Sequence, residues 1–128
     1  MLVDCERGVA VTVQDKDGST PLHEASTVEM ARFLIEHGGD ATARDKRGST
    51  PLHHAVEREN LDLAQFLIEH GADPTARDEH GMSPLHIVSD SSNVALIALL
   101  IEYGADVTAQ DENGRTPLLK HHVFIVGI

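Results

Sequence analysis

The sequence predicts an all-α protein assembled from short repeated units. One phrase, Thr-Pro-Leu-His, begins at Thr20 and Thr50 and recurs with serine at Ser83. A second phrase, Leu-Ile-Glu-x-Gly, follows each copy, beginning at Leu34, Leu67 and Leu100. The unit is about 33 residues long, a period typical of repeat architectures. Within both phrases the apolar residues lie three to four apart, which is the spacing of a helix with one buried side.

The first phrase carries a helix-start signal. A hydroxyl residue precedes a proline in every copy, and the hydroxyl can accept a free first-turn N–H where proline has none to lose. We therefore expect the first helical positions at Pro21, Pro51, Pro84 and Pro117. Leu52, Ala55 and Val56 then give a short helix one apolar side. A helix this short needs neighbours for its stability.

The second phrase predicts a further helix, which in the second repeat runs from about Leu61 to His70. Its expected buried stripe is Leu61, Ala64, Leu67 and Ile68, and the side chains expected in water are Asp62, Gln65 and Glu69. Gly71 ends the helix, as Gly38 and Gly104 do at equivalent positions, because glycine adopts the left-handed conformation that closes a last turn. We expect the segments around Leu34, Leu67 and Leu100 to lie side by side as parallel rods.

An Asp-x-x-Gly spacing precedes each first helix and predicts the tip of a loop. The aspartate can bond its own backbone and the glycine supplies a positive φ. The four pairs are Asp15 and Gly18, Asp45 and Gly48, Asp78 and Gly81, and Asp111 and Gly114.

Together the two phrases, DxxGxTPLHxA and LLIExGAD, resemble the ankyrin repeat over nearly the whole chain. The resemblance implies a helix, a tight turn, an antiparallel second helix and a projecting β-hairpin loop in each repeat, stacked into a curved solenoid. It implies that His23, His53 and His86 bond within the helix start and toward the neighbouring loop. It also implies a function in protein binding.

The repeat register divides one domain, residues 1–128, into five parts. We expect a partial upstream repeat at 1–14, a shortened repeat at 15–44, full repeats at 45–77 and 78–110, and a partial repeat with an apolar tail at 111–128. The shortened repeat lacks three residues, and we place the loss in the inter-helix turn near Ser26 and Thr27. The tail, Lys120–Ile128, either folds back as a cap or pairs with another chain.

Composition limits the location and the partners. Cys5 is the single cysteine, so no intrachain disulfide is expected, and we predict a buried apolar role for it in an intracellular protein, cytoplasmic or nuclear. Neither a membrane-spanning run nor the basic flank of a signal peptide occurs. The net charge of −11 and the 3% of aromatic residues disfavour nucleic acid and favour a protein partner with a basic patch.

Metal binding and catalysis are not predicted. Histidines one repeat apart are separated by about 10 Å, too far to share an ion, and the adjacent His121 and His122 point apart. We expect His37 and His70, in the last turns of second helices, to interact with the helix dipole. The sequence contains no phosphate loop, HExxH, GxSxG or CxxC, so we expect neither an enzyme nor a cofactor.

The predicted function is a non-catalytic scaffold that binds a protein through its concave groove and hairpin tips. In proteins similar to this one, the partner contacts the loop tips and the exposed side of the first helix. The corresponding residues here are Lys16, Asp17, Ser19, Lys46, Arg47, Ser49, His54, Glu57, Arg58, Glu79, His80, Met82, Glu112, Asn113 and Arg115, with Glu24, Ile87, Asp90 and Ser91 as further first-helix candidates. We rank Arg47, His80 and Met82 highest, because arginine can fork onto a carboxylate and methionine adapts to apolar surfaces.

Two alternatives remain beside a monomeric binder. The chain is either an assembly module that associates end to end through its open ends, or the binding segment of a longer multidomain protein. For the groove itself, the change from basic tips at Lys46 and Arg47 to acidic tips at Glu79 and Glu112 predicts a partner of opposite polarity along its length.

Overall fold

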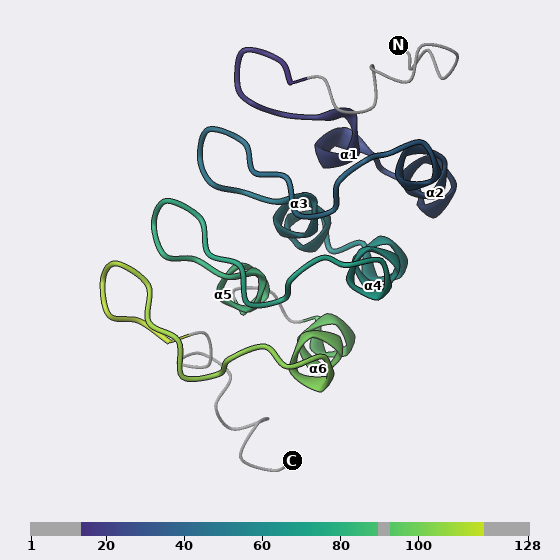
Figure 1. Cartoon of the computed structure of the whole chain (residues 1–128). Coiled ribbons are helices and arrows are strands. Elements are labelled where there is room, and N and C mark those ends of the chain that lie inside the picture. The colour runs from purple at the N-terminus through teal and green to yellow at the C-terminus, as the bar shows by residue number, and fades with distance from the viewer. Residues whose placement is uncertain (1–13, 90–92, 117–128) are drawn as a thin grey trace.

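The computed structural model describes residues 14–89 and 93–116 and shows a two-row stack of helices (Figure 1). The six helices in the described residues are α1 (Pro21–Glu24), α2 (Val28–Glu36), α3 (Pro51–Glu57), α4 (Leu61–Glu69), α5 (Pro84–Val88) and α6 (Val94–Glu102). First helices α1, α3 and α5 form one row and second helices α2, α4 and α6 form the other. The predicted all-α solenoid of helix-turn-helix units is confirmed.

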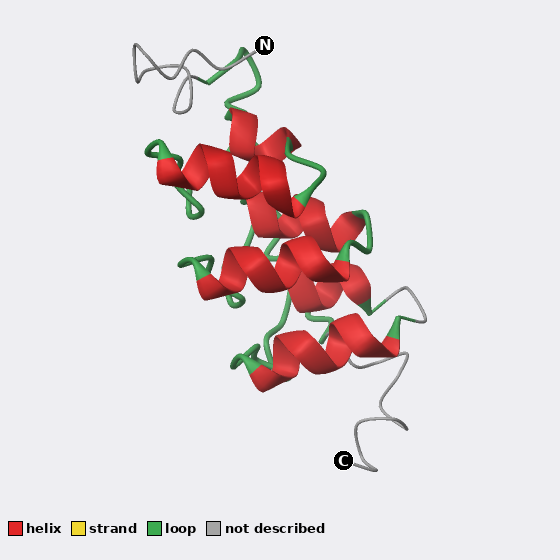
Figure 2. Cartoon of the chain, turned by 90° about the vertical axis from the view of Figure 1, so that its right-hand side faces the viewer, coloured by secondary structure: helices red, strands yellow, loops and turns green. Residues whose placement is uncertain are grey.

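The second helices lie one below another as nearly parallel rods (Figure 2). Helix α4 contacts both α2 and α6, and α3 contacts both α1 and α5. The expected alignment of the segments around Leu34, Leu67 and Leu100 is therefore confirmed. Each of these leucines is almost completely buried, so the apolar core extends along the stack between the two rows.

Local signals start the helices at the predicted positions. Pro51 is the first residue of α3, and the Thr50 hydroxyl accepts from the backbone N–H of His53. The second helices are capped by Thr27, Asn60 and Asn93, whose side chains accept from the N–H three residues on. Pro21 and Pro84 also begin their helices, whereas Pro117 lies outside the described residues.

Helix α4 follows the predicted pattern of burial in part. It ends at Glu69, one residue before the predicted end, with His70 as its C-cap. Ala64, Leu67 and Ile68 are buried as predicted, and the three polar side chains predicted to face water are exposed. Leu61 is only half-buried, whereas Leu63 and Phe66, which the predicted stripe left out, are buried. Gly71 follows with a φ of 107°, in the left-handed region that closes the helix.

The shortened repeat differs from the prediction. Helix α1 has four residues and α3 has seven, while the inter-helix segments 25–27 and 58–60 are equally long. The loss of three residues therefore shortens the first helix, and the turn keeps its length. Arg58 and Asn60 of the next repeat explain why this is tolerated, because their side chains donate to the carbonyls of Ala25 (3.0 Å) and Ser26 (3.0 Å) at the end of α1.

The loops project from the side of the first helices, as expected (Figure 1). Each is closed by two backbone bonds, for example from the N–H of Asp45 to the carbonyl of Ser49 (2.9 Å) and from the N–H of Gly48 to the carbonyl of Asp45 (2.9 Å). No strand is formed within residues 14–89 and 93–116, so the β character of the predicted hairpins is not confirmed. Predictions for Cys5, for His121 and His122, and for the apolar tail concern residues outside the described ranges.

The helix-end histidines act through defined contacts. His37 and His70 are the C-caps of α2 and α4. Their Nδ1 atoms donate to the carbonyls of Phe33 (2.8 Å) and Phe66 (2.9 Å), and each ring lies against the ring of that phenylalanine. The imidazoles thus satisfy free carbonyls at the negative end of each helix. In the described part of the chain, no helix is both long enough and apolar enough to cross a bilayer.

Candidate functional site

Backbone hydrogen bonds join the loop tips into one continuous row. The N–H of Lys46 donates to the carbonyl of Asp17 (2.9 Å), and the N–H of Glu79 donates to that of Arg47 (2.8 Å). In the same way, the N–H of Glu112 donates to the carbonyl of His80 (2.9 Å). Because each tip is bonded to the next, side chains on neighbouring tips are held at a fixed spacing.

Within each loop the aspartate organises the backbone. Asp45 Oδ1 accepts from the N–H groups of Arg47 (2.9 Å) and Ser49 (3.0 Å). Burial acts to raise the pKa of the Asp45 carboxyl, but these bonds and the contact with His54 outweigh it, so the pKa lies below its usual value. Asp15, Asp78 and Asp111 accept the same pair of bonds in their loops. The predicted Asp-x-x-Gly tips are confirmed in all four.

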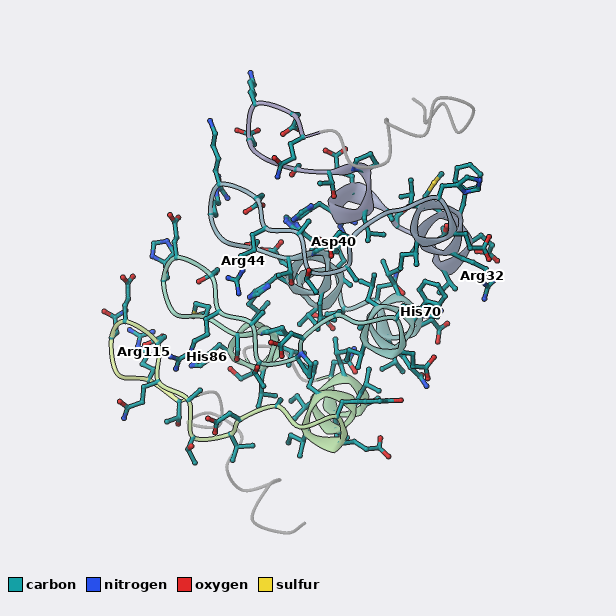
Figure 3. The ribbon with its side chains drawn as sticks, in the orientation of Figure 1. Arg32, Asp40, Arg44, His70, His86 and Arg115 are labelled. Carbon is teal, nitrogen blue, oxygen red and sulfur yellow. The ribbon has the colours of Figure 1, made fainter. Side chains whose placement is uncertain are left out.

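The recurring histidines tie each first helix to the next loop. The N–H of Thr50 donates to His53 Nδ1 (3.1 Å), so the proton of the neutral ring is on Nε2, which donates to the carbonyl of Met82 (2.9 Å). His23 and His86 repeat the arrangement toward Ser49 (2.9 Å) and Arg115 (3.0 Å). Figure 3 shows the last pair side by side. Desolvation by burial lowers the pKa of both His23 and His53, which keeps the rings neutral in these roles.

A second row of ties was not foreseen from the sequence. Arg44 Nη1 donates to the carbonyl of Arg77 (2.6 Å), and Arg77 Nη2 donates to the carbonyl of Gln110 (2.6 Å). Figure 3 shows Arg44 among the loops. The sequence did contain one sign of this shared role, because each arginine directly precedes the loop aspartate of its repeat. These two cations therefore belong to the frame.

The structure places the described candidates for partner contact at the surface, on the loops and the first helices. The half-buried ones are Ser19, Ser49, His54, Met82 and Ile87; the exposed ones are Lys16, Asp17, Glu24, Lys46, Arg47, Glu57, Arg58, Glu79, His80, Glu112, Asn113 and Arg115. Asp90 and Ser91 lie outside the described residues.

Some candidates already have intramolecular partners. Arg58 is bonded to Ala25, and His54 Nε2 donates to Asp45 Oδ2 (3.3 Å). By contrast, within the described residues the side chains of Lys16, Lys46, Arg47 and Arg115 make no hydrogen bond or ion pair, although Arg44 and Arg77 close by do. The described loops therefore present four cations that the frame does not use.

His80 brings two tips together through acidic neighbours. Its Nδ1 lies 2.8 Å from Glu112 Oε2 and its Nε2 lies 3.4 Å from Glu79 Oε2. The hydrogen bond to Glu112 is the main cause that raises the pKa of His80 above its usual 6.5, and the charges of Glu112, Glu79 and Asp78 add to it. From the sequence these tips were expected to be simply acidic, whereas protonated His80 offsets part of that charge.

We predict that Glu112→Gln lowers the pKa of His80 toward its usual value, and that Glu79→Gln lowers it less. The favourable contact is fully present below the usual pKa and disappears as the pH rises through the raised one, because only the protonated ring is stabilised by the carboxylate. Following the His80 Cε1–H resonance by NMR across pH would measure both shifts. Equal shifts in the two variants would contradict the dominant role of Glu112.

One group of described residues brings together side chains of the types that bind metal ions. It consists of His23, Asp45 and His54, whose donor atoms all lie within 4.8 Å of one another. No metal residue was expected from the sequence, because the comparison was made between equivalent or adjacent histidines, and this group joins non-equivalent positions of two neighbouring repeats.

Two family models match the chain, and together they cover residues 1–118. One, described as ankyrin repeats in three copies, matches residues 1–78, and a second, described as ankyrin repeats in many copies, matches residues 67–118. The chain belongs to the ankyrin repeat family. Ankyrin repeats are generally protein–protein interaction modules without catalytic activity. No curated protein shows a significant match to this ankyrin repeat chain.

Proposed function

We propose that this ankyrin repeat chain is a non-catalytic module that binds a protein partner on its row of loop tips and the adjoining sides of α1, α3 and α5. One observation supports this most. The frame arginines Arg44, Arg58 and Arg77 are bonded to backbone carbonyls, but Arg47 stands exposed on a tip whose backbone is fixed on both sides. Its guanidinium can therefore fork onto a partner's carboxylate without first breaking a bond within the frame.

The tips also define the kind of partner. Lys46 and Arg47 favour an acidic segment, whereas Glu79 and Glu112, together with the net charge of −11, favour a basic patch further along. Met82 lies half-buried in the same loop as Glu79 and offers an adaptable apolar contact. A partner that carries an acidic patch, and further along a basic patch with an apolar residue beside it, fits this order. The single cysteine fits an intracellular setting for the complex.

The double substitution Arg47→Ala and Met82→Ala should weaken partner binding by about tenfold or more, since a central anchor commonly contributes over 1 kcal/mol. The partner would first be captured with the intact chain and identified, and its Kd for the intact chain and the variants would then be measured. Circular dichroism would verify that helicity is unchanged.

A matched control uses the same residue types on the opposite row. Arg32 and Met30 are both exposed on α2, so Arg32→Ala with Met30→Ala removes equivalent surface away from the loops. This control should leave the Kd unchanged. If it weakens binding while the Arg47 and Met82 pair has no effect, the partner binds the second helices and the proposal is wrong.

A further inference from the structure

The junction between the first two described repeats brings together three side chains of metal-binding type. His23 comes from α1, Asp45 from the next loop, and His54 from α3. His54 Nε2 lies 3.3 Å from Asp45 Oδ2, and the rings of His23 and His54 meet edge to face with centroids 5.5 Å apart. All three donor atoms lie within 4.8 Å of one another.

The geometry points to a binding site for a divalent transition metal of the zinc type, held by His23, Asp45 and His54 across the repeat junction. Zinc takes imidazole nitrogen and carboxylate oxygen at about 2.0–2.2 Å in a tetrahedral arrangement, which places two ligand atoms about 3.4 Å apart. Asp45 Oδ2 and His54 Nε2 already have that separation. The widest separation in the group needs to shrink by at most about 1.4 Å.

Asp45 is positioned for such a role before any ion arrives. Its Oδ1 is occupied by the N–H groups of Arg47 and Ser49, so Oδ2 is the atom that faces His54. Backbone bonds that orient a ligating carboxylate in this way support metal affinity. The Asp45 side chain is 8% exposed and that of His54 is 27% exposed, so an ion can enter from the His54 side and keep a water as its fourth ligand.

His23 sets the cost of binding. Its Nδ1 is held by the Thr20 N–H (3.1 Å) at the start of α1, so Nε2 is the nitrogen available to the ion. For Nε2 to bind the ion, the neutral ring must move its proton from Nε2 to Nδ1 by exchange with solvent. Nε2 then exchanges its bond to the Ser49 carbonyl for a bond to the metal. The new Nδ1–H gives up its bond from the Thr20 N–H and can donate to the Thr20 hydroxyl, 2.9 Å away. We therefore expect weaker binding than at a structural zinc site. The bound ion would connect the first described repeat to the second.

The next junction provides a built-in comparison. His53 and Asp78 stand where His23 and Asp45 stand in the first junction, with His53 again bonded to the following loop. Ile87 occupies the position of His54, nine residues after the loop aspartate in both repeats. The second junction thus has two of the three proposed ligands in the same positions. Because the fold already contains isoleucine at the third position, replacing His54 with isoleucine should not disturb it.

The test measures Zn²⁺ by titration calorimetry and Co²⁺ by visible absorption, on the full chain and on single variants. His54→Ile should weaken Zn²⁺ binding by about tenfold or more, and should remove the intense bands of four-coordinate Co²⁺. Ile87→His should add a second equivalent of bound ion. Zinc should raise the Tm of the intact chain more than that of the His54→Ile variant.

Other histidines contribute equally to every variant, so the difference between variants isolates this site. If His54→Ile binds Zn²⁺ as tightly as the intact chain and shows the same Co²⁺ spectrum, the site does not exist. Asp45→Asn gives an independent check, because asparagine retains an oxygen for the loop N–H groups while the carboxylate ligand is lost. Unchanged Zn²⁺ affinity in this variant would overturn the assignment as well.

Discussion

Replacing His53 with alanine should lower the free energy of unfolding by about 3–5 kcal/mol. The imidazole is 2% exposed and joins Thr50, at the start of α3, to Met82 in the next loop. Alanine leaves the N–H of Thr50 and the carbonyl of Met82 without their partner, at about 1–3 kcal/mol for each buried group. The space left by the ring adds a cavity in the middle of the stack. Urea unfolding followed by circular dichroism would measure the loss.

His37→Ala is the control for this prediction. His37 is exposed and bonds one carbonyl at the end of its own helix, so its removal should cost about 1 kcal/mol or less. A similar loss in both variants would mean that the tie between repeats contributes nothing beyond a single local hydrogen bond. A clear excess for His53 would show that repeats are held together by polar ties as well as by their apolar contacts.

The helices could be predicted because their signals are local. Pro51 begins α3 and Gly71 follows α4 because the first helical position suits proline and a left-handed residue favours glycine, whatever the neighbours do. The order of the stack also follows from repetition, since every unit offers the same apolar faces to the next. The histidine ties were implied by the family resemblance and recur at the three described junctions.

The three-residue loss was expected to shorten the turn between the helices, but it shortens helix α1. The turn near Ser26 and Thr27 keeps its length, because Thr27 is the N-cap of α2, as Asn60 is of α4. Aligning the repeats on these two caps would have shown that the connection keeps its length. Helix α1 could then lose three residues because Arg58 holds the carbonyl at its end, a contact between repeats that no local pattern encodes.

The candidate site was also predictable only in part. The motif predicted that Arg47 lies on a loop tip. Only the structure shows that the side chain of Arg44 is hydrogen-bonded and that the side chain of Arg47 is not. The approach of His23 to His54 was also hidden, because the two histidines lie in different repeats and take different motif positions. Sequence periodicity compares equivalent residues, whereas the chemistry at a junction arises between residues that are not equivalent.

Gly48→Ala should destabilise the chain by about 3 kcal/mol through two separable effects. Gly48 has a φ of 77°, where a side chain costs about 1–2 kcal/mol. A Cβ there would also lie 3.0 Å from the backbone N of Glu79 and 3.2 Å from the Cα of Asp78 in the next loop. Backbone cannot turn aside as a side chain can, so the overpacking adds about 1–3 kcal/mol. The bond from Glu79 to Arg47 would lengthen, and the row of tips would lose its fixed spacing.

Gly114→Ala separates the two effects. Gly114 has the same φ of 77°, but a Cβ added there would meet nothing within 4 Å in the described part of the chain. This variant should lose only the conformational cost, about 1–2 kcal/mol. Urea unfolding measures the free energy of unfolding of both variants, and the difference between their losses gives the contribution of the contact between neighbouring tips. Equal losses would show that the loops move apart freely, and the proposal that partner binding uses a fixed spacing of the tips would then be wrong. If Gly48→Ala is the less stable variant and also binds the partner more weakly, the spacing of the tips contributes to recognition.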